Sequence, residues 1–312
     1  MQIKNVYFSF NLKEMSSLVE IKKRIVSITS TIKVTKVMQM IATAKIVKIK
    51  QMISCADKYN SLINSILAEY IKNTGDKDKI NFFFEKKNET KEKKKILLFL
   101  MSSDKGTCGS INTNIFKEFN SIVKQHQSEG HEIFVYPIGK KAKKYLESHS
   151  TKLNINIFSN SNTAAENYDN KEETAMLINN SVEEYTNGNL DAIYFVYHKF
   201  KNIITCNVVC EQVLPLVKNT NDFCDDNVDF INIDETDSTP SKIIELFVRT
   251  KFHNAYVSNL ASIVSSRMNA MDNATKNGQE IIDDLRIKYN KGRQANITSE
   301  LSDIVSGFEA IN

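Results

Sequence analysis

Apolar residues recur at alternating steps of three and four in the C-terminal part of the chain, residues 239–312. This spacing is typical of a coiled-coil seam, which is narrower than the apolar stripe of a helix packed on a domain. Thr239 and Pro240 suit a helix start, because Thr accepts from the unpaired first amides and Pro fits the first turn. One continuous helix here is about 100 Å long, so it must project from a domain or run into a partner. The predicted seam comprises Val257, Leu260, Val264, Arg267, Met271, Ala274, Gly278, Ile281 and Leu285, and then, in a shifted phase, Ile297, Leu301, Ile304, Phe308 and Ile311.

Residues 18–75 show the same spacing, and no Gly or Pro precedes Gly75. We predict one helix here, with residues 1–17 as a variable N-terminus or, alternatively, the remnant of a mitochondrial targeting sequence. Two long helices with narrow seams at opposite ends of a chain are natural partners in an antiparallel coiled coil. The predicted seam runs through Leu18, Ile21, Ile25, Ile28 and Ile32, continues in a shifted phase through Val34, Val37, Ile41 and Ala44, and ends with Ile49, Ile53, Ala56, Asn60, Ile63 and Leu67.

Between these helices, short apolar runs alternate with helical patterns over residues 95–215, which predicts a small α/β domain. The charged segment Glu85–Lys95 before it is expected to form a loop. Residues 219–238 after it hold seven acids and no base, and we interpret them as an acidic linker. The expected strands are Ile96–Met101, Ile133–Ile138, Ile155–Phe158, Ala192–Tyr197 and Thr205–Val213, and the expected helices are Ile115–Gln125, Lys140–Ser148 and Ala164–Thr186.

Composition excludes several classes of protein. The longest apolar runs, Ile96–Met101 and Ala192–Tyr197, are far shorter than the about 20 residues that span a bilayer, so any membrane link must come through a partner. A net charge of +4 is too small to indicate nucleic-acid binding. Five cysteines form no framework spacing, which favours free thiols in a reducing compartment. Cys206 and Cys210 would share a strand face, but no second ligand pair completes a zinc site.

The loop Ser102–Asn112 follows the first strand and precedes a helix, where phosphates often bind. Its glycines, Gly106 and Gly109, make neither a dinucleotide-binding fingerprint nor a P-loop. Cys108 lacks a histidine partner in a recognisable catalytic motif, so we interpret it as a structural thiol. His198 follows a predicted strand and is expected to be a surface or cap residue. We expect no catalytic, cofactor-binding or metal-binding residues.

Three blocks near the C-terminus together resemble the C-terminal helix of the γ subunit of rotary, F-type ATP synthases. They are Ser266–Thr275, Tyr289–Ala295 and Ile297–Gly307. Residues of the first helix from Ile21 to Lys45, and the loop Ser102–Asn112, resemble the same family. The sequence departs from the family pattern at Ile263, Gly292, Asp303 and Phe308.

The resemblance implies a rotor stalk without chemistry of its own, built from the helix pair and a Rossmann-like α/β domain that binds no nucleotide. Its partners would be the α and β subunits of the head, an ε or δ/ε stalk subunit and the membrane ring of c subunits, with no nucleic acid and no cofactor. The location implied is the matrix side of the mitochondrial inner membrane or, alternatively, the cytoplasmic face of a bacterial membrane. The residues expected to contact β subunits are Met38, Arg267, Arg293, Gln294, Thr298 and Glu300.

Two other functions stay open on the residues alone. One is a nucleotide-dependent α/β enzyme, which loss of nucleotide binding on changing Asp104 or Gly106 would support. The other is a coiled-coil scaffold unrelated to ATP synthesis. The first helix carries eight bases and one acid between Val19 and Lys50, which predicts either a solvated face or a surface for an acidic partner.

Overall fold

The structure is a computed structural model, and it describes residues 2–73, 93–158, 164–166, 171–216 and 239–309. The chain divides into two compact units, one of residues 1–41 with 268–312 and one of residues 42–267. Two long helices, α1 (Gln2–Asn73) and α6 (Thr239–Glu309), contribute residues to both units. Among the helices described, none is apolar enough over a sufficient length to cross a membrane.

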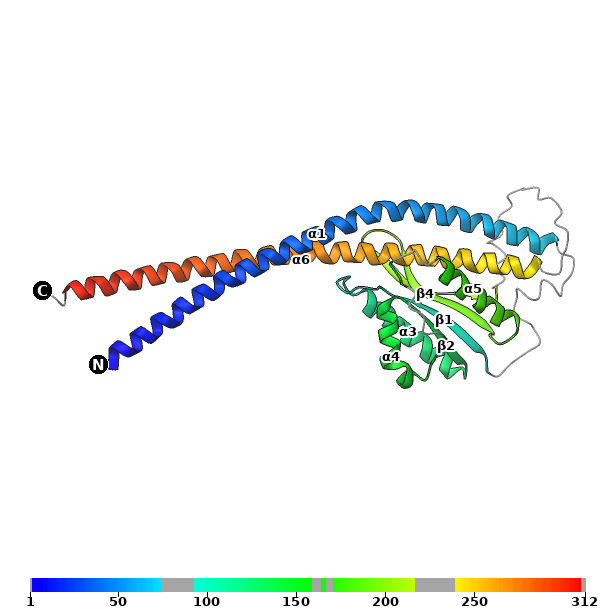
Figure 1. The fold of residues 1–312 in the computed structure, drawn as a ribbon, viewed down its shortest axis with the longest axis horizontal. Helices are drawn as coiled ribbons and strands as arrows, with labels where there is room; N and C mark the ends of the chain where they lie inside the picture. The colour runs from blue at the N-terminus through cyan, green and yellow to red at the C-terminus, as the bar shows by residue number, and fades with distance from the viewer. Residues whose placement is uncertain (1, 74–92, 159–163, 167–170, 217–238, 310–312) are drawn as a thin grey trace. The chain divides into compact units, whose positions relative to one another are not determined.

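The unit of residues 42–267 contains a five-stranded sheet in the order β3-β2-β1-β4-β5 (Figure 1). All neighbouring strands are parallel except β4 and β5, which are antiparallel. This confirms the expected α/β class. The elements are β1 (Lys95–Met101), α3 (Ile111–Ser128), β2 (Glu132–Ile138), α4 (Lys140–Leu153), β3 (Asn156–Ile157), α5 (Lys171–Thr186), β4 (Ala192–Phe200) and β5 (Cys206–Leu214).

Helices cover both faces of this sheet, which explains why β1 is apolar at nearly every position. Ile96, Leu98 and Leu100 face α3 and α4 in one core cluster with Phe119. On the opposite face, the ring of Phe252 from α6 meets Phe99 and Phe195 edge-on, with centroids 5.9 and 5.7 Å apart. Figure 1 shows α3 and α4 on one side of the sheet and α6 on the other.

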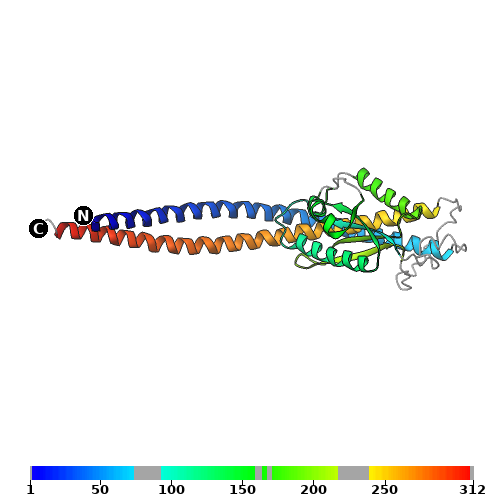
Figure 2. The same cartoon turned by 90° about the horizontal axis from the view of Figure 1, so that it is seen from below.

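Within the unit of residues 1–41 and 268–312, α1 and α6 run antiparallel (Figure 2), and contacts join residues 18–39 of α1 to residues 272–292 of α6. Thr35 and Thr275 share a 2.8 Å hydrogen bond, and the Gln39 amide donates to Asp272 over 2.9 Å. Further along, two glycines of α6 face large residues of α1: Gly278 lies against Ile32 and Gly292 against Leu18. The expected coiled coil is confirmed, and the missing side chains of these glycines let the helices approach closely.

The seam of α1 differs from the prediction, because it never changes phase. After Ile32 it continues through Thr35 and Gln39 to Ala42 and Ile46, so polar residues hold the inner positions where apolar ones were sought. The shifted set of Val34, Val37 and Ile41 is exposed instead. Polar residues suit these inner positions because they bond to Thr275 and Asp272 across the coil.

The seam of α6 beyond Met271 also differs from the prediction. Ala274 and Ile281 are exposed, whereas Thr275 and Ile282 turn inward. The second predicted seam is wrong where the structure describes it, since Ile297, Leu301, Ile304 and Phe308 all point to solvent, and Ile311 lies outside the described residues. The inner or half-buried positions are Met271, Thr275, Gly278, Ile282, Leu285, Tyr289, Gly292, Asn296 and Ser299, which keep a regular four-three spacing.

Several helix boundaries also differ from expectation, since α3 spans Ile111–Ser128 rather than Ile115–Gln125 and α4 ends at Leu153 rather than Ser148. α1 begins at Gln2 rather than near residue 18, since residues 2–17 contain no Gly or Pro to end it. α5 begins at Lys171 rather than Ala164. Residues 164–166 form a loop because the Asp104 carboxylate accepts the backbone amides of Ala165 and Glu166 over 3.1 and 2.8 Å.

Candidate functional site

Four of the predicted contact residues lie on the surface of α6, where Arg293, Gln294, Thr298 and Glu300 are all exposed. Arg293 and Glu300, seven residues apart, share one helix face, while Gln294 and Thr298, four apart, share a neighbouring one. The Thr298 hydroxyl donates to the backbone carbonyl of Gln294 over 2.9 Å. Met38 of α1 is likewise exposed. These five side chains are therefore available to a partner on more than one side of the coil.

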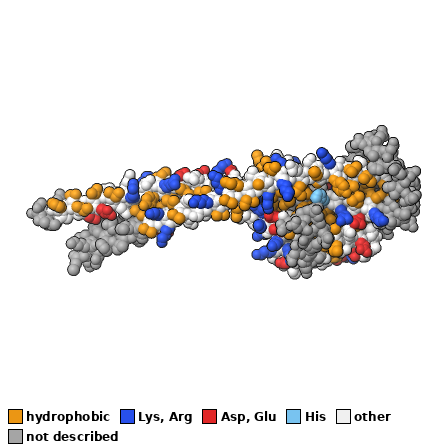
Figure 3. Space-filling model, turned by 45° about the horizontal axis from the view of Figure 1, so that its top comes forward, with side chains coloured by type: hydrophobic (Ala, Val, Ile, Leu, Met, Phe, Trp, Pro, Cys, Tyr) orange, Lys and Arg blue, Asp and Glu red, His pale blue; other side chains and the backbone are white. Residues whose placement is uncertain are grey.

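Exposed apolar residues accompany them on both helices of the same unit. Figure 3 shows apolar side chains along these helices, interspersed with Lys and Arg. The two helices pack through their inner seam alone, so the exposed apolar side chains do not contribute to that packing. Their exposure is typical of a surface that contacts a partner. The residues are Val34, Val37, Met38, Met40 and Ile41 on α1, and Ile297, Leu301, Ile304, Val305 and Phe308 on α6, which we call the outer apolar residues.

The loop Ser102–Asn112 bonds to itself rather than presenting a phosphate cradle. The Asn112 amide donates to Ser103 Oγ over 2.8 Å and to Cys108 Sγ over 3.3 Å, and Ser103 Oγ donates to the Lys105 carbonyl over 2.7 Å. Cys108 is buried, and its carbonyl accepts the Ser266 hydroxyl of α6 over 2.6 Å. These contacts make the thiol part of the packing between the loop and α6.

Arg267, one of the residues expected to contact β subunits, lies largely shielded from solvent. Its guanidinium donates to both oxygens of Glu166, over 2.7 and 3.0 Å, and the two side chains are only 13 and 11% exposed. Burial acts to raise the pKa of Glu166, but the hydrogen bonds and charge of Arg267 outweigh it and hold that pKa below its ordinary value. The pair therefore stays ionised and fastens α6 to the loop that Asp104 organises.

The prediction that His198 lies at the surface is wrong. It belongs to β4 and is 3% exposed, because α6 covers that part of the strand. Asn259 accepts its backbone amide over 3.2 Å, and Ser262 donates to its carbonyl over 3.2 Å. Burial lowers the pKa of the imidazole to about 4, against smaller opposing effects of Asn259 and the Ile111 backbone. A neutral, enclosed imidazole of this kind is a packing residue.

Sequence reasoning missed the polar residues by which α6 holds the sheet. Ser258 accepts the Phe200 amide over 2.8 Å, and Asn259 and Ser262 bond to His198. The available signal was a helix segment apolar or small on all sides, residues 255–265, which is typical of a buried helix. Small polar residues inside such a segment must find partners there.

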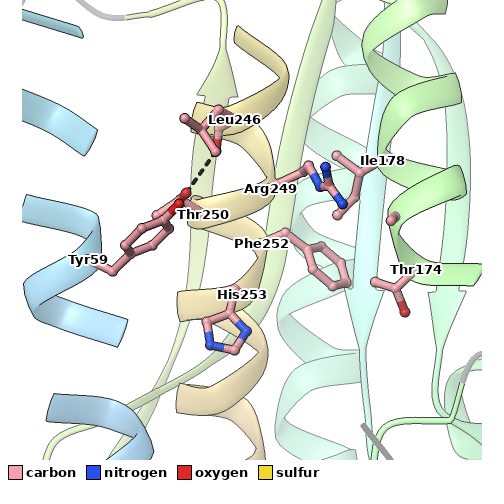
Figure 4. A pocket seen from close by; sticks show the side chains of 9 residues that line it. Tyr59, Thr174, Ile178, Leu246, Arg249, Thr250, Phe252 and His253 are labelled. Atoms are coloured by element: carbon pink, nitrogen blue, oxygen red, sulfur yellow. Dashed lines mark hydrogen bonds between the residues drawn. The ribbon is translucent and has the colours of Figure 1, made fainter. Parts of the chain in front are cut away.

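A pocket of about 350 Å³ lies in the unit of residues 42–267 (Figure 4). Within its lining, the Thr250 hydroxyl donates to the Leu246 carbonyl over 2.8 Å. The described lining residues include one guanidinium and one imidazole but no carboxylate or thiol, so among them there is no acid–base or nucleophile pair. The lining residues are Tyr59 of α1, Thr174, Ala175 and Ile178 of α5, and Leu246, Arg249, Thr250, Phe252 and His253 of α6.

Comparison with known proteins gives a consistent result. A family model described as ATP synthase matches residues 17–311. An ATP synthase gamma chain of Clostridium kluyveri is 35% identical over 299 residues, covering 95% of this chain and 99% of that protein. One of Pelagibacter ubique is 32% identical, covering 95 and 100%.

Solved structures show the same fold at lower identity. A chain of the Tetrahymena thermophila mitochondrial ATP synthase central stalk and c-ring is 24% identical with a TM-score of 0.54, over 77% of this chain and 99% of that one. A chain of the Euglena gracilis mitochondrial ATP synthase OSCP, F1 and c-ring assembly is 13% identical with a TM-score of 0.56, over 95% of each chain.

Proposed function

Because the chain belongs to the ATP synthase gamma chain family, we propose that it is the central rotor stalk of a proton-driven ATP synthase. It transmits torque from the c-ring to the catalytic β subunits and performs no chemistry itself. The observation that carries this proposal is the helix pair of residues 1–41 and 268–312, whose inner seam is satisfied within the chain and whose outer residues remain exposed. The enzyme alternative gains no support from the self-bonded loop or from the pocket.

A rotor must hold its long helix firmly in the domain where torque enters. In the unit of residues 42–267, α6 is fixed to the sheet by Ser258, Asn259 and Ser262. The Lys251 ammonium pairs with Glu211 of β5 over 3.2 Å, and that carboxylate also accepts the Tyr197 hydroxyl over 2.8 Å. The buried Glu166–Arg267 pair adds a bidentate contact, and together these contacts resist rotation of α6 within its own unit.

Partner contacts follow from the exposed residues. We assign the outer apolar residues to the inner surface of the α and β head, and the α/β domain to the stalk subunit ε or δ/ε and the c-ring. Arg293, Gln294, Thr298, Glu300 and Met38 would meet the β subunits. Arg267 would contribute only through the 13% of its side chain that is exposed.

Rotation works by differential contact. Arg293 offers a planar fork of donors for a carboxylate, while Gln294, Thr298 and Glu300 add neutral and accepting groups on neighbouring faces. A charge-assisted hydrogen bond contributes about 1.5–3 kcal/mol. A β conformation that makes one such bond is therefore favoured about tenfold or more over one that does not. As the helix turns, each β subunit would meet a different set of donors and acceptors.

The location we propose is the matrix side of the mitochondrial inner membrane, reached only through partner subunits. Bacterial relatives at 30–35% identity leave the cytoplasmic face of a bacterial membrane as the alternative. Fractionation of the source cells, with detection of the chain in mitochondrial or bacterial membranes, distinguishes the two. Salt or urea should release it without detergent, since the contact is peripheral.

The β-contact assignment is tested by replacing Arg293 and Gln294 with Ala in the assembled complex. We expect normal assembly and unchanged helix content in the isolated chain, with reduced ATPase turnover of the complex. The matched control replaces Lys288 and Asn290, which are also exposed on α6 but lie outside the proposed contact set. Normal turnover in the fully assembled Arg293/Gln294 variant, or equal losses in both variants, would refute the assignment.

A further inference from the structure

Two histidines and a glutamate converge where α3 ends and β2 begins. Glu129 Oε2 lies 3.5 Å from His126 Nδ1 and 3.2 Å from His131 Nε2. One donor atom from each of the three residues lies within 4.8 Å of the other two. Ligands about 2.1 Å from one metal ion, at tetrahedral or right angles, are separated by about 3.0–3.4 Å. Both distances from the imidazoles to the carboxylate oxygen are close to this range.

The backbone sets this arrangement before any ligand arrives. Gly130 has a φ of 80°, which ends α3 in the left-handed region and reverses the chain. The His131 amide donates to the His126 carbonyl over 3.0 Å, and the Gly130 amide to the Gln127 carbonyl over 3.0 Å. This pair of bonds is the Schellman motif, and it brings His131 back beside His126 with Glu129 between them.

The surroundings also suit a cation. The side chains of His126 and His131 are only 13 and 15% exposed, while Glu129 is 46% exposed and opens the cluster to water. The Nδ1 atoms of both histidines are buried without a hydrogen-bond partner. The site lies at the C-terminal end of α3, where the helix dipole favours positive charge. At 3.5 Å from Glu129 Oε2, the buried Nδ1 atom of His126 is too far away for a good hydrogen bond, whereas a metal ion between the two atoms would be ligated by both.

We propose that His126, Glu129 and His131 form a binding site for a divalent transition-metal ion, with water completing its coordination. Two imidazoles with one carboxylate favour zinc, cobalt, nickel or copper over magnesium and calcium, which prefer oxygen ligands. The site is separate from the residues that we assign to the β subunits, because its residues belong to the α3–β2 junction. Metal bound there would clamp the end of α3 to the start of β2.

Titration of the full-length chain with zinc chloride and with magnesium chloride, followed by calorimetry, tests the proposal. We expect one zinc per chain and no magnesium binding at the same concentrations. His126→Ala, His131→Ala and Glu129→Gln should each weaken zinc binding at least tenfold. His149→Ala is the matched control, since that histidine lies on α4 away from the cluster, and it should bind as the unchanged chain does.

Thiols could also take zinc, so a variant with Cys206 and Cys210 replaced by Ser is titrated in parallel and should keep its affinity. The visible spectrum of the cobalt-loaded chain should show nitrogen and oxygen ligation without thiolate charge-transfer bands. Circular dichroism of each variant shows whether it is folded. Absence of stoichiometric zinc binding, or binding that survives both histidine changes in folded protein, would overturn the proposal.

Discussion

Replacing Gly278 by Ala sets two effects of similar size against each other in the coiled coil. Alanine favours a helix interior by about 1 kcal/mol over glycine. The new Cβ, however, would lie 2.8 Å from Cγ1 and 3.1 Å from Cδ1 of Ile32 on α1. Carbon atoms prefer about 3.5–4.0 Å, so the helices must separate, and overpacking of this kind costs about 1–3 kcal/mol. We expect Gly278→Ala to destabilise the coil by about 1 kcal/mol.

Two further glycines of α6 provide matched controls for the same chemical change. At Gly292 the added Cβ would lie 2.9 Å from Leu18 Cδ2, the far end of a flexible side chain that can rotate away. At Gly307 it would meet no atom within 4 Å. Both Gly292→Ala and Gly307→Ala should therefore stabilise the helix, by up to about 1 kcal/mol, with less at Gly307 because helix ends fray.

Hydrogen exchange of the full-length chain, read on peptides covering residues 25–41 and 270–300, measures the local opening free energy. Gly278→Ala should speed exchange on both helices, whereas Gly292→Ala should slow it. If Gly278→Ala slows exchange of these peptides as much as Gly292→Ala does, then the close approach of Gly278 to Ile32 does not lower the stability of the coiled coil of the alanine variant. The same outcome would show that helix propensity alone sets its stability.

Two more predictions concern the unit of residues 42–267, and both are read by near-UV circular dichroism of its buried tyrosines during urea unfolding. Arg267→Met or Glu166→Gln alone should lower the free energy of unfolding by about 3 kcal/mol, since each leaves the other buried side chain without its partner. The double variant should recover part of that loss, and additive losses would contradict the pairing. Because the pKa of Glu166 is depressed in the fold, the stability it supplies is present above its unfolded pKa and should disappear as pH falls through the folded pKa. Burial lowers the pKa of His198 from 6.5 to about 4 in the folded chain. As pH falls from 6.5 to 4, the unfolded chain takes up this proton before the folded chain does, so the free energy of unfolding should decrease by about 3 kcal/mol in total. His198→Gln should flatten that part of the pH profile while His149→Gln leaves it unchanged, and equal profiles for both would refute the burial argument.

The sequence predicted the pairing of the two terminal helices and most of their inner positions, but not the inner positions of α1 between Ile32 and Ile49 or several of those of α6 after Met271. Alternating steps of three and four were sought among apolar residues, while the inner positions after Ile32 are Thr35 and Gln39. Their partners Thr275 and Asp272 are polar as well, so the pattern is visible only when both helices are aligned. Exposed apolar residues such as Ile297 and Leu301 have the same three-four spacing as an inner seam and were therefore predicted to form one. An interpretation based on hydropathy alone cannot separate a face that packs within the chain from one reserved for partners.

Residues that depend on distant chain segments were harder still. The strands and most helices followed from local pattern, yet Glu166 was placed within the helix predicted over Ala164–Thr186. Its loop conformation depends on Asp104, sixty-two residues earlier, which accepts its amide. His198 was misplaced for a similar reason, since α6 covers it only in the folded chain. The spacing of His126, Glu129 and His131 was readable in the sequence, but only the turn at Gly130 shows that the three converge.

Substitutions at the outer apolar residues of α6 should weaken assembly of the complex without lowering the stability of the isolated chain. Leu301 and Phe308 are 57 and 73% exposed, so replacing both with Gln, which retains helix propensity, should change the free energy of unfolding of the isolated chain by less than about 0.5 kcal/mol for each substitution. If the head subunits bury these side chains, each loses about 1.5–3 kcal/mol of binding energy on substitution.

Assembly of the Leu301/Phe308 variant with α and β subunits should therefore weaken by at least tenfold, measured by co-purification at graded concentrations. Ile204→Gln is the control, because Ile204 is 86% exposed in the other unit and should leave assembly with the head unchanged. If the Leu301/Phe308 variant assembles with unchanged affinity, the head does not bury the outer apolar residues of α6. The polar residues around Arg293 would then have to hold the helix in the head alone, and their charge-assisted hydrogen bonds would have to supply the binding energy that the apolar residues do not.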